Sequence, residues 1–350
     1  MKNSKKLQQN LLSWYDVNKK ALPWRTTKNP YNIWISEIMS QQTQVETVMP
    51  YYARFIEKFP DVASLAAADD AELLKLWEGL GYYSRARNLK IAAQQIMSDF
   101  DGKFPEALAD IKSLKGIGSY TTAAIASISF GQAEPAIDGN LLRVTSRLFA
   151  LADDISKASS RKIFDEKLRT IISADRPGDF NQALMDLGSK ICTPKNPDCT
   201  ECPISDYCAA FGAGTQEDFP IKSKKIKQKK VYYQAFAVKN ADGEYLLEKR
   251  ADSGLLASMW TFPMVEVTDE NADVQLPENL RKIVVKTEEV GEITHVFSHL
   301  KWFVKVVSCQ LSADRVTEDA LYNEKWTTAA DKKTVFPKPQ LKMFELLENE

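Results

Sequence analysis

Four cysteines lie within seventeen residues near the middle of this chain, with the spacing Cys-x6-Cys-x2-Cys-x5-Cys. They are Cys192, Cys199, Cys202 and Cys208. Four thiolates in so short a stretch can close around one centre, either a four-iron cluster or a zinc ion. The six-residue first gap is longer than the gap of about two to four residues with which zinc knuckles and ribbons open. The pattern therefore favours an iron–sulfur cluster over zinc, and over a disulfide pair or unrelated buried thiols.

The composition is that of an ordinary soluble globular protein, with 44% hydrophobic and 27% charged residues. A chain of 350 residues is long enough for two or three domains. The basic start, Met1–Lys6, leads into polar residues, so we expect neither a signal peptide nor a membrane span and place the protein in the cytoplasm. Reduced thiols in that compartment suit metal ligation better than disulfides. Cys309 lies in an apolar run and is most simply a core residue.

The net charge of −1 hides an asymmetry along the chain. Residues 1–230 carry 32 Lys and Arg against 27 Asp and Glu, whereas residues 231–350 carry 14 against 20. The basic excess of the first part is compatible with contacts to a nucleic acid, although it is weak evidence when taken alone. Six lysines within residues 221–230 predict an extended linker, either solvated or lying along a phosphate backbone.

The pattern of apolar residues changes from helical to strand-like near residue 230. Residues 7–210 show helical spacing, for example in 65–76, 89–97, 123–128 and 141–151. Residues 231–239 and 244–249 then read as two strands around a turn, and 293–297 and 302–307 as a second hairpin with 298–301 at its tip. The chain therefore begins with an all-helical part and ends with a part that contains a sheet.

Two carboxylates stand out within the helical part. Glu37 is surrounded by apolar residues, which makes its charged form costly and its carboxyl a plausible proton donor near neutral pH. Asp138 precedes a predicted helix, where aspartate is a common N-cap. Between them, Gly116 and Gly118 join two predicted helices and could present backbone N–H groups to a phosphate, or form a plain helix connection.

These features together resemble the base-excision DNA glycosylase superfamily typified by endonuclease III. The hairpin glycines, the Ile137-Asp138-Gly139-Asn140 stretch and the cysteine spacing carry the likeness. Within that superfamily the chain resembles the adenine DNA glycosylases of the MutY type. This second likeness covers nearly the whole chain and rests on three ordered stretches, Leu22-Pro23-Trp24-Arg25, residues 36–45 and residues 77–89.

The resemblance implies a multidomain protein: an all-α helix-hairpin-helix glycosylase core with an iron–sulfur loop, and a C-terminal α+β Nudix-like domain. It implies a four-iron, four-sulfur cluster (4Fe-4S) on the four cysteines and a structural monovalent cation at the helix-hairpin-helix. The expected partner of this monomer is double-stranded DNA with an adenine:8-oxoguanine or adenine:guanine mispair. The expected domains are 29–134 (six helices with the hairpin), 1–28 with 135–218 (cluster), 219–231 (basic linker) and 232–350 (8-oxoguanine recognition).

The resemblance also assigns the chemistry of a hydrolase that releases adenine. Glu37 would protonate the base, and Asp138 would stay ionised and stabilise the cationic sugar. Tyr120 and Asn140 would orient these groups. Bifunctional relatives carry a lysine nucleophile where this chain has Tyr120, and tyrosine cannot form an imine, so we expect a monofunctional glycosylase. The sequence alone cannot show that two acids about a hundred residues apart meet; the resemblance supplies that link.

Further contacts follow from the same resemblance. A flipped adenine would meet Arg25 and Gln182, while Gln42, Thr43, Leu80 and Tyr82 would contact the DNA beside the gap, although ordinary helix packing also explains such residues. Residues 254–263 resemble the stretch before a Nudix catalytic helix, but the Glu-rich magnesium box is absent from 265–280. The domain is therefore expected to read 8-oxoguanine through the hairpin-tip residues Phe297, Ser298 and His299, which could otherwise be just a loop.

Three alternatives remain open from the sequence. An endonuclease III-like pyrimidine glycosylase is disfavoured by Tyr120 and by the extra C-terminal domain. A zinc-bearing DNA-binding protein without catalysis is disfavoured by Glu37 and Asp138. A nucleotide pyrophosphatase with a helical appendage is disfavoured by the missing magnesium box.

Overall fold

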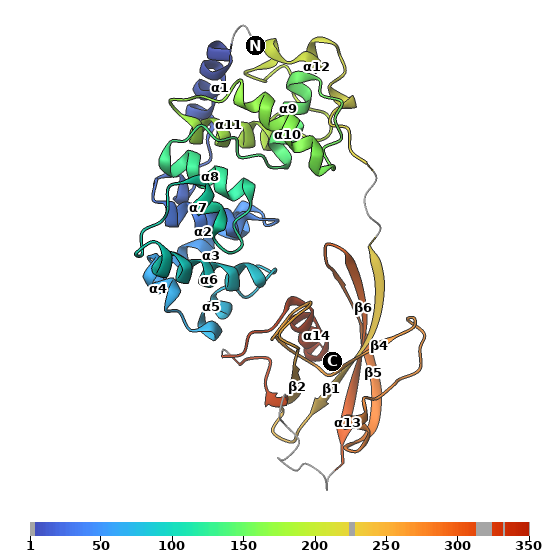
Figure 1. Ribbon diagram of the computed structural model, residues 1–350. Helices are drawn as coiled ribbons and strands as arrows, with labels where there is room; N and C mark the ends of the chain where they lie inside the picture. The colour runs from blue at the N-terminus through green and yellow to red at the C-terminus, as the bar shows by residue number, and fades with distance from the viewer. Residues whose placement is uncertain (1–3, 224–227, 313–323, 332, 350) are drawn as a thin grey trace. The chain divides into compact units, whose positions relative to one another are not determined.

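The computed structural model describes residues 4–223, 228–312, 324–331 and 333–349 (Figure 1). The chain divides into two compact units. The first comprises Met1–Ala68 and Ser84–Lys224, and the second comprises Asp69–Tyr83 and Lys225–Glu350. The domain boundaries expected from the sequence stay a prediction. The observed units differ from them by joining Asp69–Tyr83 to the C-terminal part, because these residues contact it.

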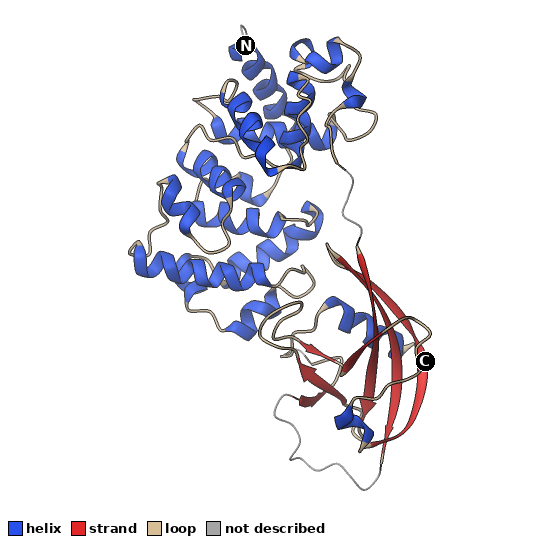
Figure 2. Ribbon diagram, turned by 45° about the vertical axis from the view of Figure 1, so that its right-hand side comes forward, coloured by secondary structure: helices blue, strands red, loops and turns tan. Residues whose placement is uncertain are grey.

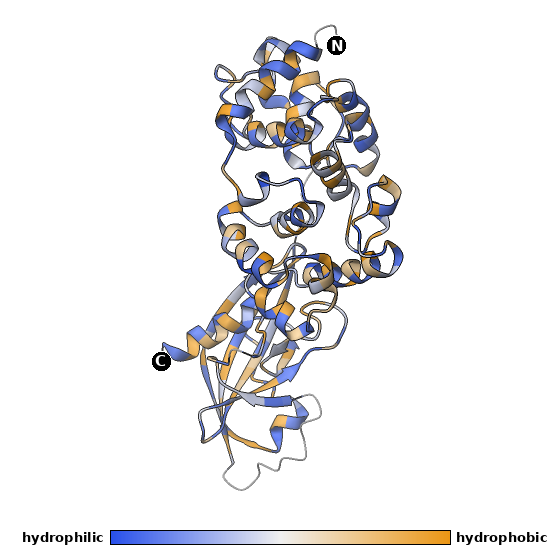
Figure 3. Ribbon diagram, turned by 90° about the vertical axis from the view of Figure 1, so that its left-hand side faces the viewer, coloured by the Kyte–Doolittle hydropathy of each residue, from blue (hydrophilic) through white to orange (hydrophobic). Residues whose placement is uncertain are grey.

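The first unit is helical, as the apolar spacing predicts, and hydrophobic and hydrophilic residues alternate along its helices (Figure 3). Polar caps set several helix starts: Asn29 accepts from the Tyr31 N–H, and Asp61 forms a capping box with Ser64. The helices are α1 (Ser4–Asn18), α2 (Pro30–Ser40), α3 (Val45–Lys58), α4 (Val62–Ala66), α6 (Ser84–Asp99), α7 (Leu108–Ser113), α8 (Ser119–Phe130), α9 (Gly139–Phe149), α10 (Arg161–Arg169), α11 (Pro177–Lys190) and α12 (Ala209–Gly212).

The stretch 65–76, whose apolar residues have helical spacing, is not one helix. The structure has α4 and then α5 (Asp70–Leu76), which belongs to the second unit. The break occurs because the side chain of Asp69 accepts hydrogen bonds from the Ala71 and Glu72 N–H groups and starts a new helix. The apolar spacing continues through the break and therefore conceals it.

Two features of packing position the candidate site. Helix α8 is buried on almost every side from Thr121 to Ser127 and packs against α2, α7 and α11, so its first residues are held firmly. Helix α1 packs on α11, and a core of α1, α9, α10 and α11 side chains, among them Leu11, Leu148 and Phe180, lies beside the cysteine loop.

The second unit is built on a mixed sheet with strand order β3-β2-β1-β6-β5, in which β4 also pairs with β1 and β7 with β2. β1 and β6 are parallel, and the other pairs are antiparallel. The strands are β1 (Lys229–Lys239), β2 (Tyr245–Lys249), β3 (Trp260–Thr261), β4 (Met264–Val267), β5 (Val284–Val296), β6 (Leu300–Leu311) and β7 (Glu324–Thr327).

Side chains alternate between the two faces of this sheet, as the period of a strand requires. Ala235 and Ala237 of β1 join the core under α14 (Lys338–Glu348), which lies against one face of the sheet (Figure 2). Phe236 and Val238 join the opposite core, which includes Cys309, so the prediction of a buried core cysteine is confirmed. The hairpin expected around 298–301 is also confirmed as β5 and β6.

The stretch where a Nudix magnesium box would lie holds no long helix. It contains β4, a turn and the four-residue α13 (Glu278–Arg281). Strand β1 begins at Lys229 and pairs with β6 there, so it overlaps the last residues of the expected basic linker. Residues 224–227 of that linker lie outside the described residues. Among the residues that are described, no helix combines the length and apolar character needed to cross a membrane.

Candidate active site and metal centre

Glu37 and Tyr120 meet in the helical unit although 83 residues separate them. Glu37 lies on α2 between the buried residues Ser36 and Ile38, and Tyr120 lies in the first turn of α8. The phenol O–H of Tyr120 donates to Glu37 Oε2 at 2.6 Å. Because α2 packs directly on α8, the two helices hold this hydrogen bond between them.

Asp138 is the N-cap of α9, as its sequence position indicates. Its Oδ1 accepts from the Leu141 N–H at 2.7 Å, and its Oδ2 accepts from Asn140 Nδ2 at 3.0 Å. Both oxygens are therefore held by donors that favour the ionised form. The cap and the amide fix the direction in which the carboxylate points.

Electrostatic coupling places Glu37 and Asp138 in one cluster, which we call the acid pair. Burial raises the pKa of Glu37, and the negative charge of Asp138 raises it further, while the Tyr120 hydrogen bond and the Arg25 charge act in the opposite direction. Burial also raises the pKa of Asp138, but hydrogen bonds from Leu141 and Asn140 oppose the rise. Glu37 accepts one side-chain hydrogen bond, from Tyr120, whereas Asp138 accepts from both Leu141 and Asn140, so these donors favour the ionised form more at Asp138.

Arg143 is a site residue that the sequence analysis missed. Its Nη2 donates to Asn140 Oδ1 and to the Gly188 carbonyl, and its Nε donates to the Cys192 carbonyl. A chain of hydrogen bonds thus runs from the cysteine loop through Asn140 to Asp138. A Cβ atom on Gly188 would lie 2.8 Å from that of Asn140, so a glycine within helix α11 is the sequence signal for this close approach.

Arg25 is held by a second residue that the sequence did not single out, Asp186. The guanidinium makes two parallel hydrogen bonds to the carboxylate, at 2.7 and 2.8 Å, and lies over the Tyr15 ring. Arg25 and Gln182 line the same small cavity, which has a volume of 130 Å³. The two predicted adenine contacts are therefore brought together, and the charge of Arg25 reaches Glu37.

Replacing Asp186 by asparagine is expected to lower the free energy of unfolding by about 3 kcal/mol, because Arg25 would keep its charge in a buried place. The side chains of the pair are only 11% and 7% exposed. The matched control is Asp179→Asn on the same helix, whose ion pair with Arg176 is 38% exposed, and it should cost less than about 1 kcal/mol. Urea unfolding compares the two variants, and equal losses would contradict a special contribution from the buried pair.

The four cysteines lie near one another and can serve as the ligands of one iron–sulfur cluster. Burial, together with the other three cysteines, raises the pKa of the Cys202 thiol to about 12, so all three lie within electrostatic range of Cys202. The Arg147 guanidinium donates to Cys192 Sγ at 3.4 Å and supplies positive charge for a thiolate-bound centre. A four-iron cluster binds each thiolate through a different iron and spaces its ligands more widely than a single ion does.

The hairpin between α7 and α8 needs only one of its two glycines for its backbone shape. Gly116 has φ of 80°, and a Cβ atom there would lie 2.8 Å from Asn88. Gly118 has φ of −95°, which any residue adopts. A Cβ atom on Gly118 would point into open space. The monovalent cation expected at this hairpin stays a prediction.

The loop after α2 carries Gln42 and Thr43. Gln42 adopts the left-handed conformation, with φ of 57°. Arg85 holds this loop in place, since its Nη1 donates to the carbonyls of Ile38 and Gln41 at 2.8 and 2.7 Å. Arg85 is thus a further supporting residue that the motif containing it did not reveal.

The remaining predicted residues lie in the second unit. Tyr82 has φ of 49° and is 46% exposed, and its phenol is hydrogen-bonded to Ser298 Oγ at 2.8 Å. Leu80 is buried. The Phe297 ring packs edge-on against Trp302, and the His299 carbonyl accepts from the Lys229 N–H. The structure therefore brings Tyr82 to the hairpin tip.

Comparisons with known families agree with this architecture. Residues 35–170 match the HhH-GPD superfamily of base excision DNA repair proteins, and residues 192–208 match the iron–sulfur binding domain of endonuclease III. Residues 234–346 match the NUDIX domain. The match over residues 192–208 fits a four-iron, four-sulfur cluster held by the cysteine loop.

Curated relatives and solved structures narrow the family. The chain is 34% identical to the adenine DNA glycosylase of Mus musculus, over 87% of this chain and 70% of that protein. It is 33% identical to that of Buchnera aphidicola (subspecies Schizaphis graminum) over 97% of both, and 35% identical to that of Arabidopsis thaliana over 90% of this chain and 59% of the plant protein. A thermostable thymine-DNA glycosylase structure covers 61% of the chain with a TM-score of 0.56 at 29% identity, and 98% of that structure is matched. The chain belongs to the adenine DNA glycosylase family, whose members are hydrolases of base excision repair.

Proposed function

We propose that the protein removes adenine paired with 8-oxoguanine or guanine in duplex DNA, without cutting the strand through an enzyme-bound imine. The observation that carries the proposal is the Tyr120–Glu37 hydrogen bond at 2.6 Å beside Asp138. This arrangement supplies an acid, an anion and no amine nucleophile at the position of Tyr120. The bond between a base and deoxyribose breaks through an oxocarbenium-like state, which needs just such an acid and anion.

The acid pair divides the work according to its surroundings. Glu37 carries the proton and gives it to adenine, at N7, so that the base leaves as a neutral molecule. Asp138, with two donors on its oxygens, stays ionised and stabilises the positive charge that develops on the sugar. Tyr120 orients Glu37, and Asn140 orients Asp138. After base loss Glu37 is ionised and can accept a proton from the attacking water.

The base has to leave the helix before it reaches the acid pair, at a cost of a few kcal/mol. In this proposal Arg25 and Gln182 contact the extruded adenine. Gln42, Thr43, Leu80 and Tyr82 fill or border the space that the base leaves, and the backbone of Gly116 and Gly118 holds a phosphate. Support comes from the cavity shared by Arg25 and Gln182 and from the exposed ring of Tyr82.

The hairpin tip of the second unit is proposed to read 8-oxoguanine through Phe297, Ser298 and His299. The Tyr82–Ser298 hydrogen bond supports this role, because it ties the reading loop to a residue proposed to sit beside the lesion. The double variant Ser298→Ala with His299→Ala is expected to lower the preference for 8-oxoguanine over guanine by about tenfold, the effect of about 1.4 kcal/mol of lost contacts. Competitive binding of the two duplexes measures the preference. An unchanged preference would rule out this reader, and Ser308→Ala on β6 serves as the control.

The proposed activity is tested by following free adenine from four duplexes, with adenine opposite 8-oxoguanine, guanine, cytosine or thymine. Release is expected from the first two, fastest from the first. Borohydride should trap no covalent adduct, because Tyr120 cannot form an imine. Release of an oxidised pyrimidine instead of adenine, or efficient trapping, would contradict the proposal.

We also propose that the protein acts as a monomer in the cytoplasm. The cysteine loop supports this location, since an iron–sulfur cluster needs reduced thiols. Size-exclusion chromatography with light scattering tests the monomer, and a dimer mass would contradict it.

A further inference from the structure

The segment that joins α8 to Asp138 carries one carboxylate of the acid pair but belongs to no helix or strand. Residues 131–138 have no regular secondary structure. Among the described residues, no backbone-to-backbone hydrogen bond involves residues 135–137, and Pro135 has no N–H group to offer. The position of Asp138 therefore depends on side chains that reach this segment from neighbouring helices.

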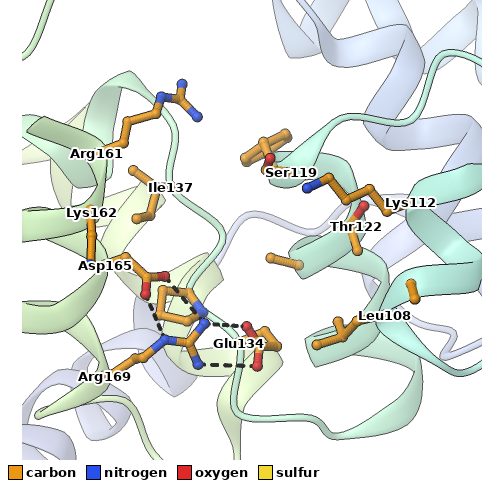
Figure 4. A pocket seen from close by; sticks show the side chains of 14 residues that line it. Leu108, Lys112, Ser119, Thr122, Glu134, Ile137, Arg161, Lys162, Asp165 and Arg169 are labelled. Atoms are coloured by element: carbon orange, nitrogen blue, oxygen red, sulfur yellow. Dashed lines mark hydrogen bonds and ion pairs between the residues drawn. The ribbon is translucent and has the colours of Figure 1, made fainter. Parts of the chain in front are cut away.

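One side of this segment borders a cavity. Glu134, Pro135 and Ile137 line it, together with Tyr120 of α8, and its volume is 520 Å³. Figure 4 shows the Glu134 carboxylate beside the cavity, bound by Arg169 at 2.5 and 3.1 Å. The Arg169 side chain is 44% exposed, and such an ion pair stabilises weakly. On this side the segment is therefore held only loosely.

Asn181 of α11 supplies the buried support of the segment. Its side chain does not line the cavity, and the residue is 1% exposed. Its Nδ2 donates to the Glu134 carbonyl at 2.8 Å, and its Oδ1 accepts from the Ala136 N–H at 3.1 Å. Ala136 is fully buried, and Asn181 is the partner that the described structure gives to its N–H. Loss of this amide would leave a buried backbone donor unpaired, which is costly.

The same amide joins the segment to α8. Its second N–H donates to Ser127 Oγ at 2.9 Å. Gly178, one turn earlier on α11, allows this reach, because a Cβ atom there would lie 2.7 Å from a backbone atom of α8. Helix α8 also carries Tyr120, which binds Glu37. One buried amide thus connects the helix that orients Glu37 with the segment that carries Asp138.

We infer that Asn181 is a positioning residue for adenine release, which sets the place of Asp138 relative to Glu37 by tying residues 134–136 to α8 and α11. Both N–H groups of its amide and the carbonyl oxygen are bound within the protein, so no free N–H is left for a ligand. Asn181 therefore acts through Asp138 and not on the adenine itself. The inference rests on the proposed function, in which both acids take part.

A double-mutant cycle tests this role, with the full chain in excess over an adenine:8-oxoguanine duplex. Asn181→Ala is expected to lower the single-turnover rate of adenine release by about 10- to 10²-fold, because a misplacement of about 1 Å can cost 10²-fold. In the Asp138→Asn background the same change should lower the rate by less than about twofold, since the carboxylate that Asn181 positions is already gone. Equal losses in both backgrounds would overturn the inference, and so would a wild-type rate in Asn181→Ala.

The matched control is Gln234→Ala on β1 of the second unit. Gln234 is also 1% exposed, and its amide holds a loop with three bonds: it donates to the Ala272 and Asp273 carbonyls and accepts from the Gln275 N–H. Both substitutions should lower the melting temperature, because each leaves buried backbone groups unpaired, but only Asn181→Ala should lower the rate. An equal loss of rate in Gln234→Ala would trace the effect to stability alone and overturn the inference.

Ser127→Ala carries the same cycle if Asn181→Ala does not fold. It removes only the bond from Asn181 to α8, and it should give a several-fold loss of rate that disappears in the Asp138→Asn background. No loss, or the same loss in both backgrounds, would overturn the inference. The proposed function fails in a different way, since the wild-type protein itself would then release no adenine from this duplex.

Discussion

Glu37→Gln is expected to lower the single-turnover rate of adenine release by about 10²- to 10⁴-fold, the range for loss of a general acid. Glutamine keeps the size of the side chain and can still accept the Tyr120 hydrogen bond, which is 2.6 Å long in the wild type. The loss would therefore come from the missing proton and not from a collapsed site. Quenched-flow release of free adenine measures the rate, with DNA affinity determined in parallel.

The matched control is Glu57→Gln on α3, where the glutamate is exposed. It should leave the rate unchanged. A Glu37→Gln rate within tenfold of the wild type would remove Glu37 as the acid.

The same substitution should stabilise the fold at alkaline pH. The pKa of Glu37 is raised in the folded protein, so the fold favours its neutral form, and that stabilisation is lost as pH rises through the folded pKa. Glutamine is neutral at every pH. The gain in free energy of unfolding, about 1 kcal/mol, should therefore be present at high pH and absent at low pH. Thermal melts at both extremes, with Glu57→Gln alongside, measure it; a gain independent of pH would contradict the raised pKa.

Asp138→Asn is the second change with a large expected effect, a loss of about 10²- to 10³-fold in the rate of adenine release. Asparagine is as good an N-cap as aspartate, so α9 should remain intact and only the negative charge is removed. The cap bond to the Leu141 N–H is 2.7 Å long. Single-turnover kinetics and thermal melts separate the loss of charge from the loss of the cap.

Two further variants separate the loss of the Asp138 charge from the loss of the helix cap. Asp138→Ala removes cap and charge together and should cost about 1 kcal/mol of stability in addition. Asp61→Asn makes the same change at the N-cap of α4, outside the site, and should leave the rate as it was. A normal rate in Asp138→Asn would show that the sugar cation does not depend on this carboxylate.

The sequence predicted the local features of this fold better than the long-range ones. Helix positions, the Asp138 cap and the β5–β6 hairpin follow from apolar spacing and from neighbours in the chain. The parallel pairing of β1 with β6 was not predicted, because nothing local to β1 specifies a partner about seventy residues away. The break between α4 and α5 was not predicted, because the helical spacing of apolar residues continues across Asp69, the single residue that caps α5.

The site divides in the same way. Glu37, Asp138 and the cysteines could be named from their surroundings in the sequence. Asp186 and Arg143 could not be named in this way, because their partners lie far away in the sequence. Asp186 binds Arg25, 161 residues away. Arg143 binds the carbonyls of Gly188 and Cys192, 45 and 49 residues away. The fold brings these buried charged residues to their partners. Of these contacts, only the close approach at Gly188 has a signal in the sequence, a glycine inside a helix.

The pH dependence of adenine release by the wild-type protein tests the acid pair most directly. The reaction needs Glu37 protonated and Asp138 ionised at once, so the single-turnover rate from an adenine:8-oxoguanine duplex should rise and then fall as pH increases. The alkaline fall reports loss of the proton from Glu37, and the acid fall reports protonation of Asp138. A rate that stays constant from about pH 5 to pH 9 would contradict the account.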